Sequence, residues 1–323
     1  MGPESTHLVL LYYLYAKIDD PNLYRDQHRA LCERLNLKGR IIIAEEGING
    51  TVSGLRADCE AYMEALKADA LTQNIEWKVD PANEHRFPRL SIKARKEIVS
   101  LNLGEEDLDP NEATGKHLSP EEWQAAMKDP NAVILDARND YEWEMGHFEG
   151  AILPDIESFR ELPQWVRDNR EKLEGKKILT YCTGGIRCEK FSSFLVHEGF
   201  EDVNQLHGGV VMYSKNEQTQ GDQFKGQLYV FDDRVGVEVN FTDNACTLGV
   251  DIHTNEACKR FVNCDYKPCN KQFFLSEESE LKYGRFCEPR CKKAYELHGP
   301  HGCKGWVKGK DDIYQGVNED CCE

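Results

Sequence analysis

The chain has 323 residues, 13 cysteines and a formal net charge of −17 at pH 7. That length suits two or three domains, each with its own hydrophobic core. The negative charge argues against a protein that coats nucleic acid through bulk charge, but it leaves room for a local basic surface.

The longest apolar run, LVLLYYLYA at residues 8–16, is too short to span a bilayer. No basic segment precedes this run, so it predicts a buried strand rather than a membrane segment or a signal peptide. The odd number of cysteines in a chain without an export signal predicts reduced thiols and a cytoplasmic protein.

The first hundred residues alternate between strand and helix patterns. Helices are predicted at 21–35, after Asp20, and at 55–68. The βαββαβ order of elements predicts a ferredoxin-like (acylphosphatase-like) α+β domain over residues 6–100, followed by a polar linker at 101–116. The expected strands are 7–16, 40–44, 51–54, 75–80 and 89–100.

A second pattern begins at Ser119, which forms a capping box with Glu122, while Pro120 suits the first position of the helix. Continuous apolar strands then alternate with helices, which predicts an α/β domain with a parallel sheet covered on both faces, over residues 117–225. The expected strands are 132–137, 150–155, 176–182 and 203–206, and the expected helices are 157–173 and 188–197.

The segment YCTGGIRCEK at 181–190 places Cys182 at the end of a predicted strand, just before a helix. In open α/β sheets this edge binds ligands, and backbone N–H groups, the helix N-terminus and Arg187 all favour a thiolate. The alternatives are an inert buried thiol or a disulfide with Cys188. Four residues lie between Cys182 and Arg187, a loop that suits one extra sulfur better than a phosphate: Thr183, Gly184, Gly185 and Ile186.

The remaining residues, 226–323, form a cysteine-rich module in which basic side chains outnumber acidic ones between 257 and 310. Such a basic surface indicates either an anionic partner or a solvated face. The module has few aliphatic residues, so the spacing of its cysteine pairs predicts one structural zinc site, the alternative being free thiols. The predicted ligands are Cys264, Cys269, Cys287 and Cys291. No GxGxxG loop is present, so no nucleotide cofactor is evident.

Three segments together resemble a rhodanese domain over residues 117–225: VILDARNDYEWEMGHFEGAI, YCTGGIRCEK and GFEDVNQLHGGVVMY. The resemblance implies that Cys182 bears a persulfide and that Thr183 to Arg187 form its loop. Four further positions fall in the upstream signature of that domain, where we expect structural support: Asp136, Arg138, Gly146 and His147.

With GRIIIAEEGINGTVSG and HRFPRLSIKARKEIVS, the similarity extends over nearly the whole chain to the bacterial tRNA uridine hydroxylase family. This family uses oxygen to make 5-hydroxyuridine at the wobble position of the anticodon. The resemblance therefore implies an oxidoreductase with molecular oxygen as co-substrate and a tRNA anticodon loop as partner.

The catalytic candidates are Cys182, Arg187 and Cys188. A thiolate that adds to carbon 6 of uracil makes carbon 5 nucleophilic toward an oxidant, and Cys188 would modulate or resolve an oxidised state. Alternatively Cys182 carries a persulfide, as in a sulfurtransferase served by a small-molecule sulfur donor or reductant. A third alternative is a rhodanese-like binding module without catalysis, which the intact Cys182 and Arg187 disfavour.

RNA binding needs cations for phosphates and a pocket for a splayed base. One candidate set combines cations around the predicted strand at 89–100: Arg86, Arg89, Lys93, Arg95 and Lys96. The other lies in the tail: Arg285, Arg290, Lys292 and Lys293.

Similar family members have two further cysteine pairs in this tail. Here Ser276, Ser279 and a lone Cys246 stand at those positions, which implies that a second metal site has been lost.

Overall fold

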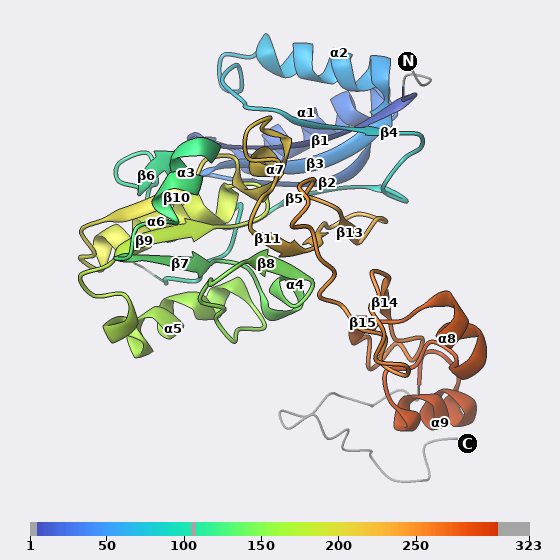
Figure 1. Ribbon diagram of the computed structural model, residues 1–323. Coiled ribbons are helices and arrows are strands. Elements are labelled where there is room, and N and C mark those ends of the chain that lie inside the picture. The colour runs from blue at the N-terminus through green and yellow to red at the C-terminus, as the bar shows by residue number, and fades with distance from the viewer. Residues whose placement is uncertain (1–4, 105–107, 303–323) are drawn as a thin grey trace.

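The computed structural model describes residues 5–104 and 108–302 (Figure 1). Its N-terminal part is a five-stranded sheet in the order β4-β1-β3-β2-β5. The first four strands have the ferredoxin-like arrangement that the sequence predicts, and β5 adds an edge strand parallel to β2. The elements are β1 (His7–Tyr15), α1 (Pro21–Arg34), β2 (Lys38–Ala44), β3 (Gly47–Leu55), α2 (Arg56–Lys67), β4 (Lys78–Ala82) and β5 (Leu90–Ala94).

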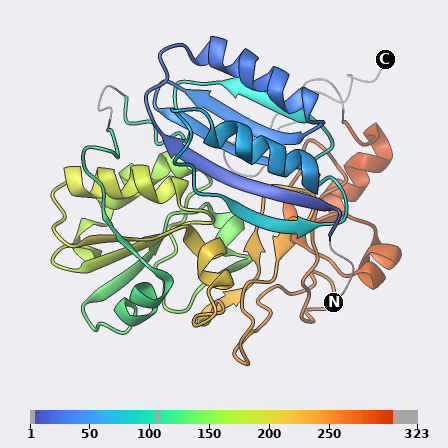
Figure 2. The same cartoon turned by 90° about the horizontal axis from the view of Figure 1, so that it is seen from above.

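The two faces of this sheet have different neighbours. Helix α1 begins where the Asp20 side chain accepts hydrogen bonds from the N–H groups of Asn22 and Leu23. Leu10 and Tyr12 of β1 point into a core that α1 and α2 close on one face. The middle part of the chain packs against part of the other face, so the helices and a second domain lie on opposite sides of the sheet (Figures 1 and 2).

The middle of the chain forms a parallel four-stranded sheet in the order β6-β10-β9-β7, which confirms the predicted α/β domain. Helices α3 and α6 lie on opposite faces of this sheet, each over its own buried cluster. The elements are β6 (Lys116–Leu118), α3 (Pro120–Ala126), β7 (Ala132–Asp136), α4 (Asp140–Trp143), β8 (Gly146–Phe148), α5 (Leu162–Asp168), β9 (Lys177–Tyr181), α6 (Ile186–His197), β10 (Val203–Leu206) and α7 (Gly209–Lys215).

Two predicted elements of this domain are wrong. The segment 150–155 is no strand, because it makes a single bridge at Ile152 and the next N–H that the ladder needs would come from Pro154, which has none. The predicted helix at 157–173 divides into two short 3₁₀ turns around α5. Pro163 lies in the first turn of α5 and so marks a helix start instead of a helix interior.

The C-terminal residues first extend the middle domain and then form a separate small lobe (Figure 1). β11 pairs with β8, and the lobe itself contains β14, β15, α8 and α9 around buried Tyr266 and Leu275. No helix in residues 5–104 and 108–302 is long and apolar enough to cross a membrane. The elements are β11 (Phe224–Gly226), β12 (Leu228–Tyr229), β13 (Gly236–Val237), β14 (Phe261–Asn263), β15 (Gln272–Phe274), α8 (Glu277–Tyr283) and α9 (Pro289–His298).

Candidate active site

Cys182 follows the last residue of β9, and α6 begins four residues later at Ile186, two residues before the predicted start. The side chain of Cys182 is fully buried, and the N–H of Gly185 donates to its Sγ over 3.1 Å. Gly185 has a φ of +103°, which side chains rarely adopt, so the turn requires glycine at this position. The sequence therefore bends the main chain around one sulfur atom.

Burial by itself raises the pKa of Cys182, because a thiolate loses solvation. Hydrogen bonding with Cys188, the charge of Arg187 and the N–H of Gly185 outweigh that effect and lower the pKa to about 5. Burial and the neighbouring Cys182 raise the pKa of Cys188 well above its ordinary value. At neutral pH the pair is therefore a thiolate beside a thiol.

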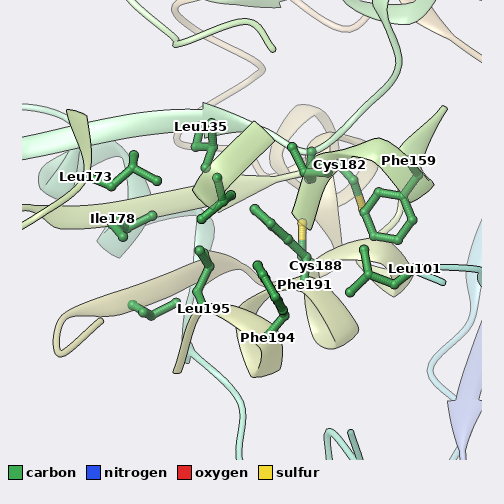
Figure 3. Packing of buried hydrophobic residues seen from close by; sticks show 14 of the residues in the cluster. Leu101, Leu135, Phe159, Leu173, Ile178, Cys182, Cys188, Phe191, Phe194 and Leu195 are labelled. Atoms are coloured by element: carbon green, nitrogen blue, oxygen red, sulfur yellow. The ribbon is translucent and has the colours of Figure 1, made fainter. Parts of the chain in front are cut away.

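The two cysteines lie in one buried apolar cluster with Phe159, Phe191 and Leu101 (Figure 3). Leu101 comes from the predicted linker and is completely buried. Most of the side chains around the two sulfur atoms are apolar, which strengthens the few hydrogen bonds that reach them.

Arg187, whose charge favours the Cys182 thiolate, is itself paired with a buried carboxylate. Its guanidinium donates to both carboxylate oxygens of buried Glu142 in α4, over 2.5 and 2.8 Å. It also donates to Thr183 Oγ over 3.3 Å. Burial raises the pKa of Glu142, but the charge and hydrogen bonds of Arg187 hold it below the ordinary value. Glu142 is a site residue that sequence analysis missed.

Three of the upstream signature residues, Asp136, Arg138 and Gly146, lie in a second buried network. Arg138 donates to Asp136 and to the carbonyl of Gly146, the latter over 2.6 Å. The hydroxyl of Tyr181 donates to Asp136 as well. His147 is hydrogen-bonded to the carbonyl of Trp143 over 2.8 Å. These contacts hold β7, β8 and β9 together behind the Cys182 loop.

Strand β1 of the N-terminal domain packs directly on the loop. A Cβ at Gly184 would lie 2.8 Å from Leu11, and one at Gly185 would lie 2.8 Å from the Tyr13 hydroxyl. Tyr13 donates to Glu189 over 3.1 Å. Both loop glycines therefore allow a close approach between domains, in addition to the turn that the sequence suggested.

A buried lysine fixes the same interface on the other side of the loop. Lys190 in α6 contacts Glu46 over 2.6 Å and Glu97 over 2.9 Å, and both carboxylates belong to the N-terminal domain. With only 2% of the Lys190 side chain exposed, the two ion pairs hold the sheet and the Cys182 loop in one arrangement.

A cavity of about 480 Å³ lies between the open face of the N-terminal sheet and the Cys182 loop. Its volume falls in the range of about 300–1,000 Å³ that suits small-molecule and nucleotide sites. Cys182, Thr183 and Arg187 line it on one side, and β1, β2 and β3 line it on the other. The thiolate, the domain interface and the cavity therefore meet at one place.

Of the cations predicted to contact RNA, only Arg95 lines this cavity. Arg86 forms ion pairs with Glu84 and Asp233. Lys93 and Arg89 lie exposed on and beside the edge strand β5, and Lys96 donates to the carbonyl of Gly104 over 3.4 Å. The tail cations lie in the separate lobe with α8 and α9 (Figure 1).

The four cysteines of the lobe come together as their spacing predicted. Their sulfur atoms all lie within 4.8 Å of one another, with Cys269 to Cys287 at 3.5 Å and Cys287 to Cys291 at 3.7 Å. A tetrahedral zinc with bonds of about 2.3 Å needs sulfur separations of about 3.8 Å, so the donor set fits that metal. Four close cysteines in this lobe could thus bind a metal ion.

The serines at the expected positions of the lost cysteine pair surround a carboxylate instead. Asp251 accepts from the N–H of Ser276 over 2.7 Å and from the hydroxyl of Ser279 over 3.0 Å. It also accepts from the N–H groups of His253 and Thr254. Hydrogen bonds to a single aspartate thus stabilise the segment in which the family resemblance implies a lost metal site.

Comparisons with known proteins match three successive segments of the chain. Family models match residues 7–98 (UPF0176 acylphosphatase like domain), 119–216 (Rhodanese-like domain) and 225–292 (Rhodanase C-terminal). The tRNA uridine(34) hydroxylase of Shouchella clausii (strain KSM-K16) is 53% identical over 289 residues, which cover 90% of this chain and 89% of that protein. The protein of the same name from Bacillus mycoides (strain KBAB4) is 52% identical over 292 residues, 90% of this chain and 91% of its own. This chain therefore belongs to the tRNA uridine(34) hydroxylase family.

Proposed function

We propose that this protein hydroxylates carbon 5 of uridine 34 in the tRNA anticodon and that the thiolate of Cys182 is its attacking group. One observation supports this assignment above the others: a buried thiol with a pKa of about 5 lines an interdomain cavity, in a member of this family. The tRNA substrate and the free state of every described cysteine support a cytoplasmic location.

The reaction begins when the Cys182 thiolate bonds to carbon 6 of the uracil and pushes electrons onto carbon 5. Carbon 5 then takes one atom of molecular oxygen. Loss of the carbon 5 proton breaks the sulfur–carbon bond and restores the ring. The second oxygen atom leaves as water, for which an external reductant of the thiol class supplies two electrons and two protons.

The other loop residues stabilise the thiolate or connect the loop to the N-terminal domain. The Gly185 N–H and the Cys188 thiol stabilise the thiolate before attack and again when it leaves. Arg187 supplies positive charge and is held in place by Glu142. Gly184 and Ile186 lie against β1, so they also link the loop to the N-terminal domain.

We propose domain limits of 6–100, 117–225 and 226–323 around the linker at 101–116. Residues 105–107 and 303–323 lie outside the described residues.

Heavy-isotope oxygen gas tests the proposed function. The purified protein, an anticodon stem-loop RNA and a thiol reductant should yield 5-hydroxyuridine whose new hydroxyl oxygen comes from the gas. Mass spectrometry of the nucleosides reads the source of that atom. Label from water instead would contradict the oxygen-dependent reaction, and sulfur transfer from thiosulfate to a thiol without any hydroxylated uridine would favour a sulfurtransferase.

Metal analysis tests the proposed structural zinc. We expect about one zinc per chain in the freshly purified protein and loss of the cooperative unfolding of the C-terminal lobe after chelation. The matched variants are Cys287→Ser, which removes a ligand, and Cys246→Ser, which removes an exposed cysteine outside the cluster. Zinc-free protein with an intact lobe would contradict the four-thiolate site.

A further inference from the structure

The open face of the N-terminal sheet carries a set of side chains that the Cys182 chemistry does not use. Residues of β2 and β3 alternate, so every second side chain points away from the α1 and α2 core. Arg40 and Ile42 of β2 lie opposite Thr51 and Asn49 of β3 in the strand register. All four line the cavity over the Cys182 loop, on the sheet face opposite α1 and α2.

This face is electropositive in a chain of negative net charge. Arg40, Arg95 and Arg160 line the cavity, and within residues 5–104 and 108–302 no carboxylate forms an ion pair with any of them. Glu97 also lines the cavity and shares Lys190 with Glu46, so three arginines face one partly compensated carboxylate. Lys93 adds a positive charge at the edge of this face, because it lies beside Ile42 on the edge strand β5 and points to the same side of the sheet. Phosphate groups are the complementary ligand.

An aromatic platform lies at the edge of the same cavity. Phe231 is 43% exposed, which is unusual for so large an apolar side chain. Its ring packs on Tyr229 at 5.2 Å between centroids, and Tyr229 packs on Tyr141 at the same separation. Exposed aromatic rings beside arginines favour stacking of unpaired bases.

Asn49 presents a hydrogen-bond acceptor with a fixed orientation. Its amide nitrogen donates to the carbonyl of Ile98 over 3.2 Å, and a carbonyl can only accept, so the nitrogen must face Ile98. Oδ1 is thereby left for another donor, and none of the described residues supplies one. Uracil has an N–H at position 3, whereas cytosine has an acceptor there.

We propose that this open sheet face docks the single-stranded anticodon loop and that Asn49 selects uracil, an inference that rests on the proposed function. Arg40, Lys93 and Arg95 bind the phosphates on either side of the target nucleotide. Phe231 stacks on a neighbouring base. The target uracil enters the cavity and donates its N3–H to Asn49 Oδ1, which places the ring beside Cys182. A base without that N–H is rejected because it leaves the acceptor unpaired.

Binding of a labelled anticodon stem-loop without oxygen tests the docking surface. Arg40→Ala should weaken binding about tenfold and lower the slope of log affinity against log salt by about one. Arg34→Ala is the matched control, because it removes an exposed arginine from α1 on the opposite face of the same sheet. Equal behaviour of the two variants would overturn the docking surface. Because no turnover is needed, this result stands even if the protein hydroxylates nothing.

Substrates with uridine or 3-methyluridine at the target position test the role of Asn49. In the wild type, methylation removes the N3–H and should lower kcat/KM at least about tenfold. Asn49→Ala should lower kcat/KM for uridine by a similar factor and make the two substrates nearly equal. A general structural defect would lower both and preserve their ratio. An unchanged ratio in Asn49→Ala would therefore overturn the selection of uracil by this residue.

Discussion

Cys182→Ser is expected to abolish formation of 5-hydroxyuridine, with a loss in kcat on the order of 10⁴-fold or more, because it removes the attacking atom of the reaction. A serine hydroxyl has a far higher pKa than the thiol, so the hydrogen bond from Gly185 and the charge of Arg187 cannot ionise it at neutral pH. The measurement is nucleoside mass spectrometry after incubation of the variant with anticodon stem-loop RNA, oxygen and a thiol reductant.

The control is Cys59→Ser, which replaces another buried thiol, on α2 of the N-terminal domain, and should leave kcat unchanged. A second measurement follows the thiolate itself. The difference in ultraviolet thiolate absorbance between wild type and Cys182→Ser should rise through a pH of about 5, since the thiolate forms above the lowered pKa. Appreciable 5-hydroxyuridine from Cys182→Ser, or a midpoint near the ordinary thiol value, would contradict the role of this residue.

The parts of the site that are local in sequence could be predicted. Cys182 lies between an apolar strand and an amphipathic helix, and this order fixes its place at the sheet edge. The capping box at Ser119 formed as its residues indicated. The spacing of the tail cysteines correctly predicted that the four sulfur atoms would meet.

The parts of the site that depend on tertiary packing could not be predicted from the sequence. Glu142 lies 45 residues before Arg187, and nothing in its short helix shows that the pair would be buried together. The contact between the second face of the N-terminal sheet and the Cys182 loop did have a signal in the sequence. Apolar and aromatic side chains occupy both faces of β1, whereas one open face of an antiparallel sheet normally alternates with polar residues. That pattern indicates burial on both sides, but it cannot say that the partner is the Cys182 loop.

The wrong strand prediction at 150–155 has a different cause. The apolar segment at 150–155 has the composition of a strand, and only the position of its proline relative to the ladder prevents one. Such a conflict becomes visible once the register with β7 is known. The apolar composition of this segment correctly indicated that it packs beside β7. The missing N–H of Pro154 then prevents it from forming a strand.

The buried pair of Arg187 and Glu142 gives the second large expected effect. Arg187→Ala should lower the free energy of unfolding by about 3–5 kcal/mol, because it leaves the carboxylate of Glu142 buried without a partner. The same variant should raise the pKa of Cys182, since it removes a positive charge that favours the thiolate. Urea unfolding measures the first effect, and the thiolate absorbance titration measures the second.

Two further variants separate the lost pair from a general packing defect. The double variant Glu142→Gln/Arg187→Ala removes the stranded charge, so it should recover part of the stability while the Cys182 pKa stays raised. Arg167→Ala breaks a surface pair of the same two residue types, Arg167 with Glu198 at 2.7 Å, and should cost less than about 1 kcal/mol. If Arg187→Ala were no more destabilising than Arg167→Ala, the buried carboxylate would not depend on Arg187. If stability fell but the thiolate titration did not move, Arg187 would serve only the fold, and the loop N–H groups with Cys188 would have to hold the thiolate by themselves.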